Sequence, residues 1–120
     1  MHGTMLLFQP GHNVPTVREF SDQLPTLEEL QLAIGGHLEQ VPGLKTIAYG
    51  GVVMNCTALC NEDGKLKGLP MNDLATMIWT QALRRGGHDT LQPLDWLQPL
   101  DWLVGPVVVL FGDKEFMSEL

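Results

Sequence analysis

The stretch Asn61-Glu-Asp-Gly-Lys-Leu-Lys-Gly-Leu-Pro-Met-Asn72 separates a mostly extended part of the chain from a helical segment. Its Asp63-Gly64 dipeptide tolerates the positive φ angles of a tight turn. We therefore expect a hairpin here, with a returning strand over residues 65–69 that ends before Pro70. Asn72 is a preferred residue at a helix start, because its side chain accepts a hydrogen bond from a backbone N–H that has no other partner.

Two amphipathic segments predict helices. One covers residues 72–85 behind the Asn72 cap and ends at a glycine pair. The other begins at the capping box Thr26-Leu-Glu-Glu29, in which the hydroxyl and the carboxylate each accept from a backbone amide, and it continues to Ile34. Apolar residues recur at helical spacing in both segments. The expected core faces are Leu74, Met77, Ile78 and Ala82 in the later helix and Leu27, Leu30 and Ile34 in the earlier one.

The other apolar segments have the alternating or continuous patterns of strands. Pro10-Gly-His-Asn13 supplies turn residues between the first two segments, which predicts an N-terminal hairpin. β-Branched residues become rare in the second half of the long run over residues 52–60, which disfavours a strand there. The expected strands cover residues 4–8, 15–20, 37–41, 45–49, 52–60, 65–69 and 104–111, with a turn at 112–115.

These elements predict a single α+β domain over residues 1–120. Its mostly antiparallel sheet of about five to seven strands is expected to pack with the two helices as a single pair of layers. A length of 120 residues suits one hydrophobic core better than two.

Composition and charge narrow the classes of function. The chain has 7 basic and 14 acidic residues and a formal net charge of −7, which disfavours direct binding to bulk nucleic acid. Its longest apolar run, residues 107–111, is far shorter than the roughly 20 residues that span a bilayer, so no membrane association is expected. Residues 1–8 lack the features of a secretory signal, which favours the cytoplasm, or the host cytoplasm for a phage-encoded protein.

Residues 91–96 and 97–102 are two copies of Leu-Gln-Pro-Leu-Asp-Trp. Their prolines disfavour a regular helix or a central strand, so residues 88–103 are expected to form a connection. Trp96 and Trp102 are candidate partner-binding residues, because aromatic side chains are enriched at protein interfaces. Internal packing is an equally supported interpretation of these two indoles, and packing is the expected role of Trp79.

The stretch over residues 61–72 resembles the signature of a family of small uncharacterised domains, or domains of unknown function, from bacteria, phages and other mobile elements. The similarity extends back to Leu27-Glu-Glu-Leu30 with Gly35-Gly36, and forward to residues 104–109. The chain departs from the family at His37, where an aromatic residue is usual, and in the length of its 88–103 connection. The resemblance implies an accessory protein of phage or mobile-element type.

The reactive side chains form no recognisable catalytic or metal-binding motif. The four histidines lack ligand spacing, so we expect no metal and no cofactor, and we assign no catalytic residue. Cys56 and Cys60 are expected as free thiols, because an extended chain separates them by more than a disulfide spans. The enzymatic alternative is a small hydrolase or transferase in which His37 and a carboxylate such as Asp63 activate one of these cysteines.

A candidate ligand site lies at the corner between the expected hairpin and the later helix. Lys65 and Lys67 fall on one face of the expected returning strand, close to Asn61 and to Asn72 and Asp73 at the helix start. Lysines and helix amino termini favour negative charge, so this corner predicts binding of a small anionic ligand such as a nucleotide. A solvated strand face beside a capped helix is the simpler interpretation.

The sequence therefore favours a non-enzymatic accessory domain that binds a protein partner or a small anionic ligand and interferes with a host process. Two alternatives stay open. One is the cysteine-dependent enzyme, and the other is a structural subunit that forms oligomers, of which a homodimer is the simplest.

Overall fold

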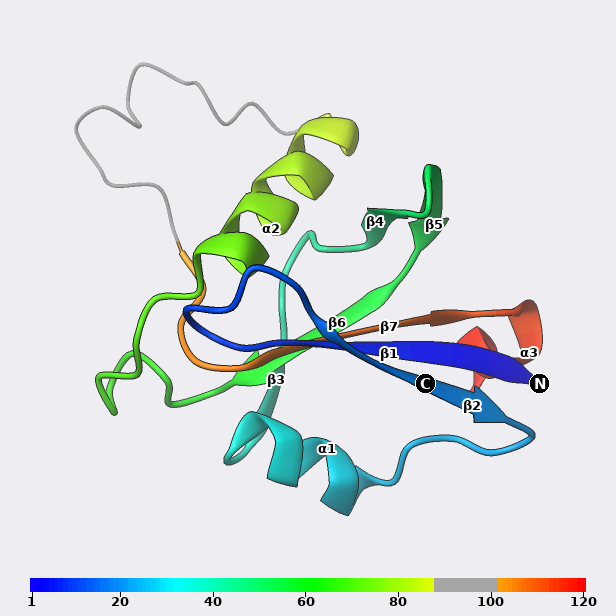
Figure 1. The fold of residues 1–120 in the computed structure, drawn as a ribbon, viewed down its shortest axis with the longest axis horizontal. Helices are drawn as coiled ribbons and strands as arrows, with labels where there is room; N and C mark the ends of the chain where they lie inside the picture. The colour runs from blue at the N-terminus through cyan, green and yellow to red at the C-terminus, as the bar shows by residue number, and fades with distance from the viewer. Residues whose placement is uncertain (88–101) are drawn as a thin grey trace.

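The computed structural model describes residues 1–87 and 102–120, and it has the α+β architecture that the sequence predicts (Figure 1). None of the helices in this part of the chain is both long enough and apolar enough to cross a membrane. The elements are β1 (His2–Phe8), β2 (Thr16–Ser21), α1 (Leu27–Ile34), β3 (Leu38–Gln40), β4 (Thr46–Tyr49), β5 (Val52–Asn55), β6 (Thr57–Asn61), α2 (Asp73–Arg85), β7 (Val107–Gly112) and α3 (Lys114–Ser118).

Five of these strands form one antiparallel sheet in the order β2-β1-β7-β6-β3, and β4 and β5 form a separate hairpin. β1 and β2 pair from His2 with Ser21 to Leu7 with Thr16, which confirms the predicted N-terminal hairpin. β7 pairs with both β1 and β6. A strand from near the end of the chain therefore occupies the middle of the sheet.

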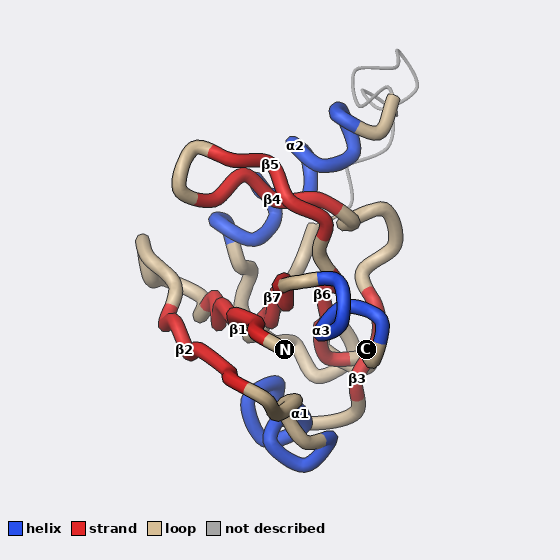
Figure 2. Tube along the Cα trace, turned by 90° about the vertical axis from the view of Figure 1, so that its right-hand side faces the viewer, coloured by secondary structure: helices blue, strands red, loops and turns tan. Residues whose placement is uncertain are grey.

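The central strand β7 is buried on both faces of the sheet. Val107, Val109 and Phe111 pack in one core with α2, whereas Val108 and Leu110 pack in a second core with α1 and α3. Figures 1 and 2 show the consequence, with α2 and the β4–β5 hairpin on one side of the sheet and α1 on the other. The structure thus has three layers where the sequence suggested a single pair, because the continuous apolar run of β7 requires cover on both sides.

α1 begins and ends as the sequence predicts. Oγ1 of Thr26 accepts from the N–H of Glu29 at 3.0 Å, and Oε2 of Glu29 accepts from the N–H of Thr26 at 3.2 Å. Both hydrogen bonds of the capping box are therefore present. Gly35 follows the helix with a φ of 83°, in the left-handed region that favours glycine.

Two of the apolar residues expected on the helix core faces are exposed. Leu27 in α1 is 63% exposed and Met77 in α2 is 51% exposed. Trp79 is the largest buried side chain of α2, which agrees with the packing role expected for it. The buried residues are Leu30 and Ile34 in α1 and Ala75, Trp79 and Ala82 in α2, while Leu74 and Ile78 are partly buried against the same core.

The apolar run over residues 52–60 forms two strands and not one. β5 pairs with β4 in the separate hairpin, whereas β6 pairs with β7 and β3 in the main sheet. The change of partner occurs at the buried Cys56, whose N–H donates to the carbonyl oxygen of Lys45 at 2.8 Å. The second half of the run is therefore a strand, although its residues gave a weaker strand signal. It belongs to a different sheet from the first half.

The returning strand expected over residues 65–69 is absent. The chain instead forms consecutive turns, in which the N–H of Lys67 donates to the carbonyl of Asp63 at 2.9 Å and that of Leu69 to the carbonyl of Gly64 at 3.0 Å. Oδ1 of Asn61 also accepts from the N–H of Asp63 at 2.9 Å. These local bonds satisfy backbone groups that a hairpin would have paired, so the prediction of a strand here is wrong.

A short helix, α3, begins within residues 112–115, where the sequence predicted a turn. Oδ1 of Asp113 accepts from the N–H of Phe116 at 2.9 Å and caps this helix. Phe116 is fully buried in the core that contains α1, which explains why the chain continues as a helix after the turn.

Asn72 joins three parts of the chain at the start of α2. Its Oδ1 accepts from the N–H of Ala75 at 3.2 Å, which confirms the predicted cap. Its Nδ2 donates to the carbonyls of Phe8 and Gly105, both at 2.9 Å, and its backbone N–H donates to the carbonyl of Leu103 at 2.8 Å. Asn72 is 1% exposed, so one buried residue fixes α2 against the end of β1 and the segment before β7.

Replacing Asn72 with alanine should lower the free energy of unfolding by about 3 kcal/mol, because the helix loses its cap and two buried carbonyls lose their donor. Urea denaturation measures this change. The Asn72→Asp variant is the matched control, since it keeps the capping oxygen but cannot donate, and it should still lose about 2 kcal/mol. A loss below about 0.5 kcal/mol in both variants would contradict the anchoring role.

Candidate functional site

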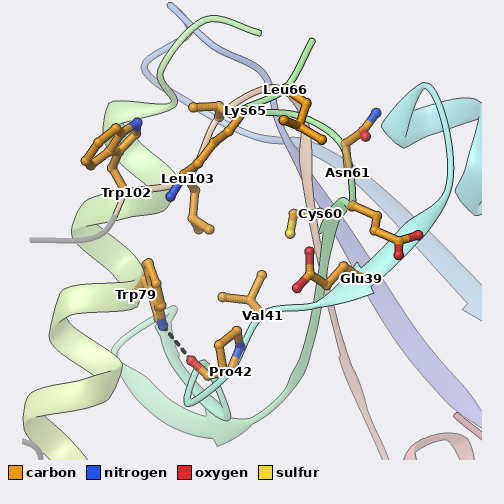
Figure 3. A pocket seen from close by; sticks show the side chains of 12 residues that line it. Glu39, Val41, Pro42, Cys60, Asn61, Lys65, Leu66, Trp79, Trp102 and Leu103 are labelled. Carbon is orange, nitrogen blue, oxygen red and sulfur yellow. Dashed lines mark hydrogen bonds between the residues drawn. The ribbon is translucent and has the colours of Figure 1, made fainter. Parts of the chain in front are cut away.

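A pocket of about 190 Å³ lies between α2 and the edge of the main sheet formed by β3 and β6 (Figure 3). Its walls come from these three elements, from the turns after β6 and from the segment before β7. Segments that are distant in the sequence thus build it together. The lining residues are Glu39, Val41, Pro42, Cys60, Asn61, Glu62, Lys65, Leu66, Trp79, Trp102, Leu103 and Val104.

Trp79 and Leu103 form the wall on the α2 side, and hydrogen bonds hold both residues in place. Nε1 of Trp79 donates to the carbonyl of Pro42 at 2.7 Å, as the dashed line in Figure 3 shows. The backbone N–H of Leu103 donates to Oγ1 of Thr76 at 3.0 Å. Thr76 lies in α2 one turn before Trp79. Both residues are 7% exposed. This wall is therefore formed before any ligand arrives.

Glu39 and Cys60 form the opposite wall. They are directly paired in the register of β3 and β6, so their side chains project from the same face of the sheet. This is the face that carries α2, because Cys60 packs against the core that contains Ala58 and Trp79. Figure 3 shows the thiol of Cys60 and the carboxylate of Glu39 directed into the pocket. This wall of the pocket therefore carries a thiol and a carboxylate, and it lies opposite the apolar wall formed by Trp79 and Leu103.

Lys65 and Trp102 meet at the rim of the pocket. Nζ of Lys65 lies 4.6 Å from the centroid of the indole ring, which is within the distance of a cation–π interaction. The contact connects the turns after β6 with the segment before β7. Val104 in that segment also forms an isolated bridge with Met71. These two contacts hold the Trp102 segment beside α2.

The charged groups in the lining have a negative balance. Among the described lining residues, the carboxylates of Glu39 and Glu62 outnumber the ammonium group of Lys65. The net charge of −7 on the whole chain has the same sign. Because a buried or half-buried anion requires positive neighbours, this lining does not favour a small anionic ligand.

The structure brings together only part of the anion site that the sequence suggested. Asn61 and Lys65 line the pocket, whereas Lys67, Asn72 and Asp73 do not. The side chain of Asn72 is committed to three hydrogen bonds, and Lys67 and Asp73 are exposed. Figure 3 shows the amide of Asn61 directed away from the centre of the pocket. The five residues do not converge, because residues 65–69 form turns and not a strand.

Several pocket residues were not identified from the sequence. Glu39 and Val41 lie two residues apart in the expected 37–41 strand, so they share one face. Which face of the strand packs against α2 depends on the strand order, which the sequence does not give. Leu103 is brought to the pocket by its bond to Thr76 in α2. Of the two repeated tryptophans, Trp102 lines the pocket, whereas Trp96 lies outside the described residues.

A second hollow of about 410 Å³ lies beside the C-terminal end of α2. Lys45 and Arg85 are its charged residues, and within the described part of the chain no carboxylate lines it. Nε of Arg85 donates to Oγ1 of Thr46 at 3.1 Å, and its Nη2 donates to the carbonyl of Thr46 at 3.2 Å. This hollow is therefore the more positive of the two.

The two cysteines are free thiols in different environments. Cys56 is buried, its Sγ donates to the carbonyl of Leu44 at 3.8 Å, and burial raises its pKa to about 11, with Arg85 offsetting part of the shift. An activated nucleophile has a lowered pKa, so Cys56 does not fit that role. Cys60 lines the pocket, but His37 is exposed and is not a lining residue. Across residues 1–87 and 102–120, no cluster of histidine, cysteine and carboxylate side chains is suited to hold a metal ion.

Cys60 should react with iodoacetamide at pH 8 about tenfold faster than Cys56, or more, because it opens into the pocket. With a pKa of about 11, only about one thousandth of Cys56 is thiolate at that pH. Peptide mass spectrometry after partial alkylation measures the rate at each site, with Cys56→Ala and Cys60→Ala as controls. Equal rates at the two thiols would contradict this placement.

Among known proteins, neither a curated protein nor a solved structure matches the chain. A protein-family model described as a domain of unknown function, DUF3846, matches residues 1–118 and so includes all the elements that build the pocket. The match confirms the resemblance to a family of uncharacterised domains, whereas an origin in phages or other mobile elements stays a prediction. The chain therefore belongs to the DUF3846 family of domains of unknown function.

Proposed function

We propose that this chain is a non-enzymatic accessory domain that binds a protein partner by accepting one partner side chain in the pocket between α2 and the β3–β6 edge. The observation that carries the proposal is the cavity itself. Two indoles, a thiol and a carboxylate from separate elements surround a space that is already formed. Such concave, mostly apolar sites with a few polar groups are the usual places for binding.

The size of the cavity limits what can enter it. Pockets for drug-sized ligands measure about 300–1,000 Å³. This pocket, at about 190 Å³, is smaller than that range. A complete nucleotide would extend far outside the cavity. One side chain of a protein partner fits, because the rest of the partner lies on the surrounding surface.

The residues of the pocket are of the kinds that dominate the energetics of protein interfaces. Trp102 at the rim is partly exposed, and tryptophan is enriched among residues whose loss costs most binding energy. Trp79 and Leu103 are already fixed by hydrogen bonds, so binding costs little side-chain entropy on this wall. The proposed pocket is therefore an efficient anchor for a partner side chain.

The enzymatic alternative has less support from the geometry. Cys56 is buried with a raised pKa, and Cys60 has a carboxylate, that of Glu39, directly opposite it in the register. A neighbouring carboxylate opposes formation of a thiolate, whereas an activated cysteine requires a base or a positive charge. The pocket is thus better suited to binding than to cysteine-based catalysis.

The small-anion alternative is supported by one different observation, the second hollow with Lys45 and Arg85. Its guanidinium group is positioned by Thr46, and arginine is well suited to bind anions. An anionic ligand would therefore be expected there and not at the corner of residues 61–72.

The family resemblance that the sequence suggested supports a proposal for the biological role. We expect an accessory protein of a phage or mobile element that acts in the host cytoplasm and interferes with a host process through its partner. The remaining alternative is a structural subunit, for which light scattering would show a stable oligomer and the pocket would stay empty in every binding assay.

A panel of N-acetyl amino-acid amides, each presenting one type of side chain, tests the proposed function. We expect at least one chemical class to shift the indole N–H signals of Trp79 and Trp102 in ¹H–¹⁵N NMR spectra at millimolar concentration. Cys60→Leu, which fills the pocket, should abolish these shifts. Lys67→Ala, outside the pocket, is the matched control and should retain them.

Two results of this experiment would overturn the proposal. One is a panel in which no compound shifts either indole signal of the folded protein. The other is unchanged binding by Cys60→Leu, because the ligand would then occupy another site.

A further inference from the structure

We infer that the partner side chain which enters this pocket is an arginine. The inference rests on the proposed function and names the chemistry of the group that the same site recognises. It departs from the anionic ligand expected from the sequence, and the reason is the set of groups that the fold places around the cavity.

The first argument is the charge of the lining. Among the described residues that line the pocket, the carboxylates are those of Glu39 and Glu62 and the cation is Lys65. Figure 3 shows the Glu39 carboxylate directed into the cavity. The net charge of −7 attracts positively charged partners over longer distances and raises their association rate. A cationic side chain is therefore favoured both during approach and inside the pocket.

The second argument is the position of Lys65 relative to Glu39. Lys65 extends towards the indole of Trp102 at the rim, whereas Glu39 and Cys60 lie on the opposite, strand side of the cavity. A cation beside Glu39 thus lies on the far side of the pocket from the ammonium group. The stacked Lys65 also shows that this corner already stabilises one positive charge on an aromatic face.

The third argument is shape. The surface between Glu39 and the rim is apolar and includes Val41 and the α2-side wall of Trp79 and Leu103. The three methylene groups of arginine can pack on such a surface while the charged head reaches a carboxylate. A planar guanidinium can form two parallel hydrogen bonds with the Glu39 carboxylate and can stack on an indole, whereas the compact ammonium group of lysine does neither as well.

The test uses three peptides that differ only in the central residue of acetyl-Gly-X-Gly-amide, where X is arginine, citrulline or glutamate. Citrulline has the shape of arginine without its charge. We expect the arginine peptide to bind about tenfold more tightly than the citrulline peptide, because its hydrogen bonds to Glu39 are charge-assisted. The NMR shifts of the Trp79 and Trp102 indoles and the protection of Cys60 from alkylation report binding.

Three substitutions locate the effect. Glu39→Gln should remove most of the preference for arginine over citrulline, while Glu28→Gln, which removes the same charge from the exposed start of α1, should leave it unchanged. Lys65→Met should strengthen arginine binding severalfold, because it removes a like charge from the rim. An anionic ligand in the same pocket would respond to Lys65→Met in the opposite direction.

The outcomes separate the inference from the proposed function. Equal affinity of the arginine and citrulline peptides, with Cys60 protected by both, would overturn the arginine inference and leave the pocket as a binding site. Tighter binding of the glutamate peptide, lost in Lys65→Met, would overturn the inference in favour of an anion. Failure of all three peptides to protect Cys60 would also overturn it, whereas the proposed function fails only if the amino-acid amide panel fails too.

Discussion

The side chain of Asn72 carries the hydrogen bonds on which the arrangement of the pocket depends. Its amide is almost completely removed from solvent and bonds to the end of β1, to the first turn of α2 and to the segment before β7. A buried polar group that loses a partner costs about 1–3 kcal/mol, so these three segments are held together as one unit. Thr76 extends the unit by accepting from the N–H of Leu103.

The pocket is a consequence of this anchoring and of the burial of β7 on both faces. Because β7 lies between β1 and β6, the segment that leads into it passes the start of α2, where Asn72 fixes it. Trp102 and Leu103 are thereby placed on one side of a gap whose other side is the β3–β6 edge. The Asn61 and Asn72 residues that bound the 61–72 stretch are both buried, so the stretch has a structural role even without a ligand.

Local sequence signals predicted much of the fold, and tertiary contacts decided the rest. The capping box at Thr26, the Asn72 cap and the N-terminal hairpin are set by residues close in sequence, and all three are confirmed. The 65–69 strand failed because local bonds around Asp63 compete with strand pairing, and residues 52–60 divide because β5 and β6 pair with different partners. The site was harder to predict, because Glu39 and Trp79 line the same pocket only through the strand order and the covering of one sheet face by α2. Residue type alone suggested a positive corner, whereas the described residues that line the pocket include more carboxylates than cations.

The central claim is that the segment before β7 belongs to the cooperative core and so preforms the pocket. Native-state amide hydrogen exchange tests this claim most directly at Leu103, whose N–H bonds to Thr76, and at Asn72, whose N–H bonds to Leu103. We predict that both amides exchange with nearly the free energy of the central β7 amides of Val108 and Val109, since they open only with the core. Exchange at Leu103 as fast as in an unstructured peptide, with β7 fully protected, would contradict the account.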